Sequence, residues 1–312
     1  MESIKLSFEA VFPIFVLMAL GYGLRAFKVA DKKAFDAINK LVFKIFLPVL
    51  LFNNIYKISS PEVFSIRLIV FTLVCIAFIY VMGYLVVLFL TDDNSKRGVL
   101  LQAFFRSNYA ILGVPLAGYI CKGSQSGLTS LMVAFIVPLF NILAVITFER
   151  FRGKNPSHKK IIKGVVTNPL IIGCVAGVIM LALNIKLPKI IEKSIDDIGK
   201  IASPLSIIVL GAGFTFSAMK GYVKELCVIS AVRLVIVPMI AVSAAVMLGF
   251  SGEALVCILI AFASPVAVSS FAMAQQMGGD EKLAAQAVVT TSCLCLITLF
   301  LWIFILSYLG LF

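Results

Sequence analysis

Charge is scarce in this sequence of 312 residues. Asp, Glu, Lys and Arg together make up 13% of the chain, whereas hydrophobic residues make up 61% and the mean hydropathy is +1.09. A soluble domain averages about a quarter charged residues and about half apolar ones. The composition therefore excludes an ordinary soluble domain and predicts a polytopic membrane protein.

Side chains suited to catalysis or metal binding are also few. The single histidine, His158, lies in a basic loop, and the seven cysteines form no CxxC or zinc-like spacing. No carboxylate lies deep in an apolar segment. An intramembrane enzyme needs a nucleophile with its base, paired aspartates or metal ligands within its spans. We therefore expect no enzymatic activity, no metal and no cofactor.

The charges that are present are mostly basic, with 27 Lys and Arg against 15 Asp and Glu and a net charge of +12. Such a balance can indicate binding to nucleic acid or to an anionic surface. Lys and Arg retained in the short cytoplasmic loops of a membrane protein give the same excess. We favour this second explanation and expect no nucleic-acid partner.

Apolar segments of about twenty residues, long enough to cross the hydrocarbon core, recur along the whole chain. The stretch 91–97 between two of them is expected to be a polar loop, and 149–160 a linker. The sequence thus predicts an all-α protein with ten transmembrane helices, near residues 8–27, 37–56, 66–90, 104–120, 126–148, 164–183, 195–216, 226–248, 254–277 and 283–308.

The two halves of the chain share features at a constant offset. A shift of 156 residues carries Pro13 onto Pro169, Gly21 onto Gly177, Lys44 onto Lys200 and Pro48 onto Pro204. Because each half contains an odd number of spans, the halves enter the membrane in opposite senses. We expect two inverted five-helix repeats, 1–148 and 164–312, joined by a linker at 149–163.

The basic residues of the loops indicate the orientation. About twice as many lie on the side of the membrane that holds the 149–163 linker as on the other side, and the richer side is cytoplasmic by the positive-inside rule. We expect a multi-pass protein of the inner cell membrane, in contact with lipid, with both termini outside.

Two spans are interrupted by polar and helix-breaking residues. The fourth carries Arg106, Ser107, Asn108, Gly113 and Pro115, and the ninth carries Ser264, Pro265, Ser269 and Ser270. Backbone freed by Gly or Pro is tolerated in a bilayer only where protein or a water-filled cavity covers it. Broken spans at corresponding places in two halves point to a transporter's binding site. The pattern favours secondary transport by alternating access.

The segment from Asn108 through Gly113 to Pro115 is similar to the N-x4-G-x-P signature of the auxin efflux carrier family, which includes plant auxin carriers and bacterial carriers of malate- or malonate-like acids. Asn168-Pro169, Ser203-Pro204 and Pro265 also fit the family pattern. The resemblance implies crossed helices 4 and 9, a dimerising scaffold of helices 1, 2, 6 and 7, and a mobile transport domain of helices 3–5 and 8–10. It also implies an elevator-like homodimer that holds an organic anion at the crossover through Asn108.

Two departures argue against auxin as the substrate. The central linker is short, and the ninth helix reads Pro265-Val-Ala-Val-Ser-Ser where plant carriers have more polar groups. A small carboxylate of the bacterial type fits better.

The ionisable residues expected inside the spans are cations, namely Lys44, Arg106, Lys200 and Arg233. A charged residue inside a membrane span is energetically costly and therefore usually has a function. Arginine can bind a carboxylate with two parallel hydrogen bonds. Arg106 and Arg233 have the alternative of snorkelling to the interface, whereas Lys44 and Lys200 are expected beside Asp36, Asp196 and Asp197. The predicted substrate-binding residues are Asn108, Tyr109, Gly113, Pro115, Ser264, Pro265, Ser269, Arg106, Asn141 and Gln275.

The break in the fourth span is predicted to begin at Ser107-Asn108, which leaves Arg106 as the last helical residue. In that arrangement Arg106 attracts the anion without touching it. Two alternatives stay open at this point. A sodium-coupled symporter of the bile-acid type would need clustered oxygen ligands, for which Ser264, Ser269 and Ser270 are the candidates. A membrane-embedded ligand sensor would need no transport.

Overall fold

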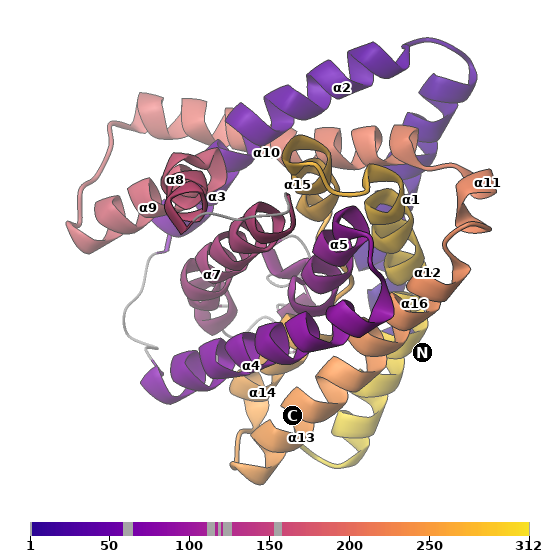
Figure 1. Ribbon diagram of the computed structural model, residues 1–312. Helices are drawn as coiled ribbons and strands as arrows, with labels where there is room; N and C mark the ends of the chain where they lie inside the picture. Colours follow the sequence, from indigo (N-terminus) through magenta and orange to yellow (C-terminus); the bar gives the residue numbers. More distant parts are fainter. Residues whose placement is uncertain are drawn as a thin grey trace.

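The chain is described here by a computed structural model, which covers residues 2–58, 65–110, 116–117, 120, 127–152 and 158–311 (Figure 1). In these ranges the regular structure is entirely helical. The α-helices are α1 Glu2–Ala26, α2 Lys32–Leu41, α3 Leu47–Tyr56, α4 Ile66–Leu90, α5 Asn94–Phe105, α7 Gly127–Phe151, α8 His158–Thr167, α9 Pro169–Ala182, α10 Lys189–Gly213, α11 Phe216–Met219, α12 Val223–Ala231, α13 Val237–Met247, α14 Gly252–Ala263, α15 Ser269–Met277 and α16 Glu281–Tyr308. Two π-helical turns, η1 Val42–Phe46 and η3 Val232–Ile236, join α2 to α3 and α12 to α13.

The lengths and compositions of these helices suit a membrane. Four described helical stretches, Ile66–Leu90, Leu131–Phe151, Val223–Met247 and Glu281–Tyr308, are long and apolar enough to cross a bilayer. A fifth is formed if α8 and α9 are taken as one span, bent by 58°. The bend falls at Asn168-Pro169, where Asn168 Oδ1 accepts from the Leu170 N–H at 2.9 Å and so caps α9. The all-helical class is confirmed, whereas the ten-span inverted repeat stays a prediction.

Helix ends differ from the sequence expectation in several places. The linker expected at 149–160 is helical at both of its described ends, because α7 runs to Phe151 and α8 begins at His158. Residues 94–97 open α5 instead of forming a loop, because Asp93 accepts a hydrogen bond from the Ser95 N–H at 2.8 Å and acts as an N-cap. Helix α10 begins at Lys189, earlier than the predicted 195, with Pro188 at its N-cap. In α5 and α10 alike a polar turn extends the helix beyond its apolar part, and in α5 a side-chain cap holds that turn.

Helices α5 and α14 lie at the centre of the fold. Every residue from Gly98 to Phe105 and from Leu255 to Ala263 is buried. Helix α4 packs beside α5 (Figure 1), and many of its large apolar side chains are exposed. A helix that is apolar on all sides belongs to a core or faces lipid, and here the two broken helices take the core.

Two crossings, of α1 with α10 and of α3 with α9, bring backbone against backbone. A Cβ placed on Gly21 would overlap the Ile208 carbonyl, and one placed on Gly177 would lie 3.0 Å from the Phe52 carbonyl oxygen. Small residues allow such close approach between membrane helices. A shift of 156 residues carries Gly21 onto Gly177 and Phe52 onto Ile208. One contact is therefore the counterpart of the other.

Both π-helical turns end two residues before a proline, Pro48 in α3 and Pro238 in α13. Proline lacks an N–H and frees the carbonyl four residues earlier, and a π-turn is one way to absorb the disruption. The carbonyl freed by Pro238 belongs to Leu234, and it accepts a hydrogen bond from Trp302 Nε1 at 3.2 Å.

Candidate functional site

The two broken segments pair with each other in the core. Helix α5 ends at Phe105, α14 ends at Ala263, and Ser107 and Val266 form an antiparallel β-bridge. The Asn108 N–H donates to the Pro265 carbonyl at 2.9 Å, and the Ala267 N–H donates to the Arg106 carbonyl at 3.4 Å. The pairing partly satisfies the backbone groups that the helix breaks set free, which a water-poor core requires.

Arg106 is buried beside this pairing, with 4% of its surface exposed. Its Nη2 donates to Asn141 Oδ1 at 2.7 Å and to Ser269 Oγ at 2.9 Å, and its Nη1 contacts the Met273 sulfur. No Asp or Glu in the described ranges forms an ion pair with it. Buried charges are normally paired. Its burial excludes snorkelling in this conformation and leaves a positive charge without an anionic partner.

A cavity of about 50 Å³ adjoins this guanidinium. It lies between residues of the paired segments and residues of α3, α7, α9 and α10. Its polar lining consists of Arg106, Ser107, Asn108, Ser206 and Ser269, and its apolar lining of Leu47, Leu50, Leu51, Ala110, Val137, Phe140, Leu170, Ala267 and Val268.

Hydrogen-bond donors at the cavity lack partners. Asn108 Nδ2 and Ser107 Oγ are buried with no hydrogen-bond partner among the described residues, and the two residues are 3% and 4% exposed. Buried polar side chains are rarely left unsatisfied, and each exception calls for an explanation. Ser269, the first residue of α15, also lines the cavity, so the positive end of that helix dipole lies there. The site is electropositive and offers donors.

A second arginine, Arg233 in η3, lies at the ends of α5 and α14. It is fully buried, and its guanidinium donates to the carbonyls of Phe104, Phe105, Ala261 and Ser264 at 2.8–3.3 Å. These carbonyls belong to the last turns of the two helices, where carbonyls lack helical partners and the dipole is negative. Arg233 therefore does not snorkel either.

Three other predicted residues at the crossover, Tyr109, Ser264 and Pro265, do not line this cavity. The Tyr109 hydroxyl donates to the Thr129 carbonyl at 3.2 Å, away from the cavity lining. The Pro265 carbonyl accepts from Asn108, and the Ser264 hydroxyl is buried without a partner in the part of the chain that the structure describes. Gly113 and Pro115 lie outside the described residues.

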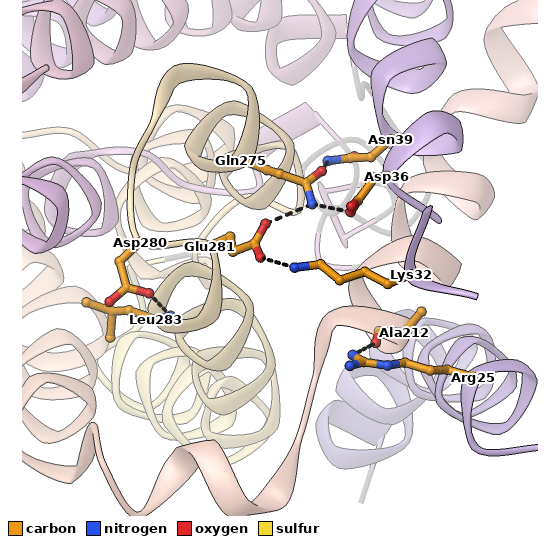
Figure 2. A network of polar contacts seen from close by, with 9 residues as sticks. All are labelled: Arg25, Lys32, Asp36, Asn39, Ala212, Gln275, Asp280, Glu281 and Leu283. Atoms are coloured by element: carbon orange, nitrogen blue, oxygen red, sulfur yellow. Dashed lines mark hydrogen bonds and ion pairs between the residues drawn. The ribbon is translucent and has the colours of Figure 1, made fainter. Parts of the chain in front are cut away.

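The structure places Gln275 outside this cavity, because six residues of α15, about 9 Å along the axis, separate it from Ser269. Figure 2 shows Gln275 in a polar network that joins α2 to α15 and α16. Its Nε2 donates to Asp36 Oδ1 at 2.8 Å and to Glu281 Oε2 at 2.9 Å, and its Oε1 accepts from Asn39. Lys32 pairs with Glu281 at 2.9 Å, and this hydrogen bond raises the pKa of the lysine.

Two of the cations predicted to lie inside spans, Lys44 and Lys200, have exposed side chains. Lys44 lies on an exposed face of η1, and Lys200 pairs with Asp196 at 2.6 Å and lies 3.8 Å from Asp197. The expected position of Lys200 beside Asp196 and Asp197 is thus found. Lys200 lies on an exposed face of α10 together with Asp196 and Asp197. The hydropathy of the segment does not show which face each residue takes.

The helix before the crossover ends one residue earlier than predicted. Phe105 is the last helical residue of α5, and Arg106 has an extended backbone with φ −90° and ψ 107°. Ser107 and Ser206 line the cavity, but they were not among the predicted site residues. Ser206 lies two residues after Pro204, and the 156-residue shift relates Pro204 to Pro48. That relation is the sequence signal that could have placed Ser206 opposite the α3 side of the cavity.

The fold and the site define a class, an all-helical membrane protein in which two broken helices pair beside a buried cation that has no counter-ion among the described residues. Comparison with known proteins agrees with this class. The model of a family described as membrane transport protein matches residues 6–303, and the chain belongs to this family, the auxin efflux carrier family of the sequence resemblance.

Two relatives align over nearly their whole length. An uncharacterized transporter of Methanocaldococcus jannaschii is 23% identical, over 96% of this chain and 98% of the relative. An uncharacterized transporter of Methanothermobacter thermautotrophicus is 24% identical, over 95% of this chain and 97% of the relative.

Proposed function

We propose that the chain is a secondary transporter of a small organic anion, a carboxylate, which binds at the pairing of the two broken helices. The observation that carries the proposal is Arg106, whose buried guanidinium has neutral partners and no described counter-ion. A mobile anion supplies the missing charge. Arg is suited to this role because it keeps its charge and has five N–H donors, enough to serve Asn141, Ser269 and a ligand together.

The neighbouring groups favour the same ligand. Asn108 Nδ2 and Ser107 Oγ are unpartnered donors at the cavity, and a carboxylate accepts several hydrogen bonds. The start of α15 adds a positive dipole end. The described cavity lining contains no acidic side chain, so nothing there repels an anion.

The size and the lining of the cavity favour a binding site that moves during transport. A pocket for a small organic ligand usually has about 300–1,000 Å³, and this one has about 50 Å³. Helices must therefore move apart before an organic acid enters. Residues of helices 2, 6 and 7 of the scaffold, Leu47, Leu50, Leu51, Leu170 and Ser206, form one wall. That wall is mostly apolar, so the transport domain can slide along it without breaking many hydrogen bonds, in an elevator-like movement that exposes the site alternately to each side.

We further propose the ten-span topology, with repeats 1–148 and 164–312, both termini outside and the 149–163 linker cytoplasmic. The paired glycine contacts support it, because Gly21 against Ile208 and Gly177 against Phe52 are related by the same 156-residue shift that the sequence shows. A homodimer through the scaffold helices belongs to the same proposal. Helix α9 exposes Ile172, Val175 and Ile179, a surface suited to lipid or to a second subunit.

Binding and flux measurements on the purified protein test the proposal. A ligand that binds only the folded state raises the melting temperature. We expect small mono- or dicarboxylates to raise it, and matched neutral amides to leave it unchanged. Uptake of a stabilising carboxylate into proteoliposomes must follow. Binding without flux would establish the sensor alternative, and stabilisation by amides alone would refute an anion site.

A further inference from the structure

Arg233 occupies a position that the proposed transport mechanism does not itself require. Its three guanidinium nitrogens contact four backbone carbonyls, with Nε 2.8 Å from Ser264 O, Nη2 2.9 Å from Ala261 O, and Nη1 3.2 and 3.3 Å from Phe104 O and Phe105 O. The residue is fully buried. No described carboxylate pairs with it.

Carbonyl oxygens at the ends of broken helices are the groups with which transporters coordinate a coupling cation such as Na⁺. In this chain four carbonyls at the C-terminal ends of α5 and α14 converge on a guanidinium instead. Arginine keeps its charge at any working pH and donates five N–H groups. It can therefore satisfy the carbonyls and neutralise the negative ends of both helices without any ion from solution.

We propose that Arg233 is a resident cation that takes the place of a coupling ion at the crossover, so that anion binding and transport by this chain need no Na⁺. The inference rests on the proposed anion transport. It concerns whether that transport is coupled to an ion and which residue fixes the geometry of the anion site. It also separates this chain from a sodium-coupled symporter. Arg233 is a positioning residue, since it contacts the backbone of Phe105 rather than the cavity.

Its effect on the anion site is carried by a short path. Phe104 and Phe105 directly precede Arg106, and Ser264 directly precedes Pro265, whose carbonyl pairs with Asn108. Holding these carbonyls therefore fixes the two extended segments that carry the proposed anion donors. If the guanidinium is removed, the helix ends keep four unsatisfied carbonyls and a negative potential close to the anion.

The test uses Arg233→Ala in the full-length purified protein, with malonate as the probe ligand. In choline buffer we expect malonate affinity to fall about tenfold or more, since displacing Arg106 or Asn108 costs about one hydrogen bond to the charged ligand. Millimolar guanidinium, too dilute to denature, is expected to restore much of the affinity, because it can occupy the vacated position. In the wild type, replacing Na⁺ by choline at constant ionic strength is expected to change nothing.

Arg67→Ala is the matched control. Arg67 also donates to a backbone carbonyl, that of Leu248, but it lies on the exposed surface above the Phe250 ring. We expect this variant to bind malonate as the wild type does, with no response to guanidinium. A response equal to that of Arg233→Ala would show a general solvent effect and overturn the inference.

A second measurement needs no carboxylate. Guanidinium is expected to raise the melting temperature of ligand-free Arg233→Ala and not that of the wild type, so a failed malonate assay would count against the proposed function alone. Should Arg233→Ala not fold, Arg233→Gln takes its place in the same assay. Sodium-dependent malonate binding by the wild type would overturn the proposal that Arg233 is a resident cation. So would an Arg233→Ala protein whose malonate affinity and melting temperature do not respond to guanidinium.

Discussion

Replacing Arg106 should separate folding from function, because a buried charge without a counter-ion costs stability and is retained for another purpose. Arg106→Gln removes the charge and leaves Asn141 Oδ1 and Ser269 Oγ without their donor. Each unsatisfied group costs about 1–3 kcal/mol, whereas relief from burying the cation recovers several kcal/mol. We therefore expect the melting temperature of the ligand-free protein to stay equal or to rise.

Anion binding should respond in the opposite direction. A hydrogen bond to a charged group contributes about 1.5–3 kcal/mol, so Arg106→Gln should weaken carboxylate binding by about 10- to 150-fold. Arg106→Lys keeps the charge but has one nitrogen, which cannot serve Asn141, Ser269 and a ligand together. It should lose less than the Gln variant does.

Isothermal titration at low and high salt provides the assay. Lys44→Gln is the matched control, since it removes one cation from an exposed position in η1, and its affinity should equal that of the wild type. Unchanged affinity in Arg106→Gln would refute the reasoning, because the anion would then bind elsewhere. Equal and severe loss in the Lys and Gln variants would instead show a bidentate contact that lysine cannot replace.

Three further predictions follow from single positions. Asn108→Leu should abolish carboxylate binding in a titration while expression and melting temperature change little, because Nδ2 has no described partner to lose; retained binding would contradict the site. Gly21→Ala should destabilise the protein by about 1–3 kcal/mol, seen as a lower melting temperature, since its Cβ overlaps the Ile208 carbonyl. Gly23→Ala is the control, because its Cβ meets only the Phe27 ring at 3.8 Å. A cysteine at Arg152 should react in intact cells only with a membrane-permeant maleimide, and labelling by an impermeant one would reverse the proposed orientation.

The sequence predicted those features that depend on composition and local chemistry. Apolar runs predicted the helices because backbone that is buried or exposed to lipid must form its hydrogen bonds internally. The breaks at Asn108 and Pro265 were predicted because a polar residue or a proline is unusual within such runs. Ends of helices were predicted less well. The N-cap at Asp93 turned a polar stretch into helix, and its side-chain bond depends on geometry rather than on hydropathy.

The family and the polytopic membrane class followed from the sequence by itself, since hydropathy, the 156-residue offset and the motif at Asn108 are all linear features. Only the tertiary structure decided which cations are buried. Lys44 matches Arg106 and Arg233 in charge and in apolar surroundings along the chain, yet Lys44 is exposed and the two arginines are enclosed. Burial depends on which helix faces another, and the oxygens that surround Arg233 come from positions 28 to 129 residues away. No local pattern encodes that convergence, because it arises when α5 and α14 end side by side in the core.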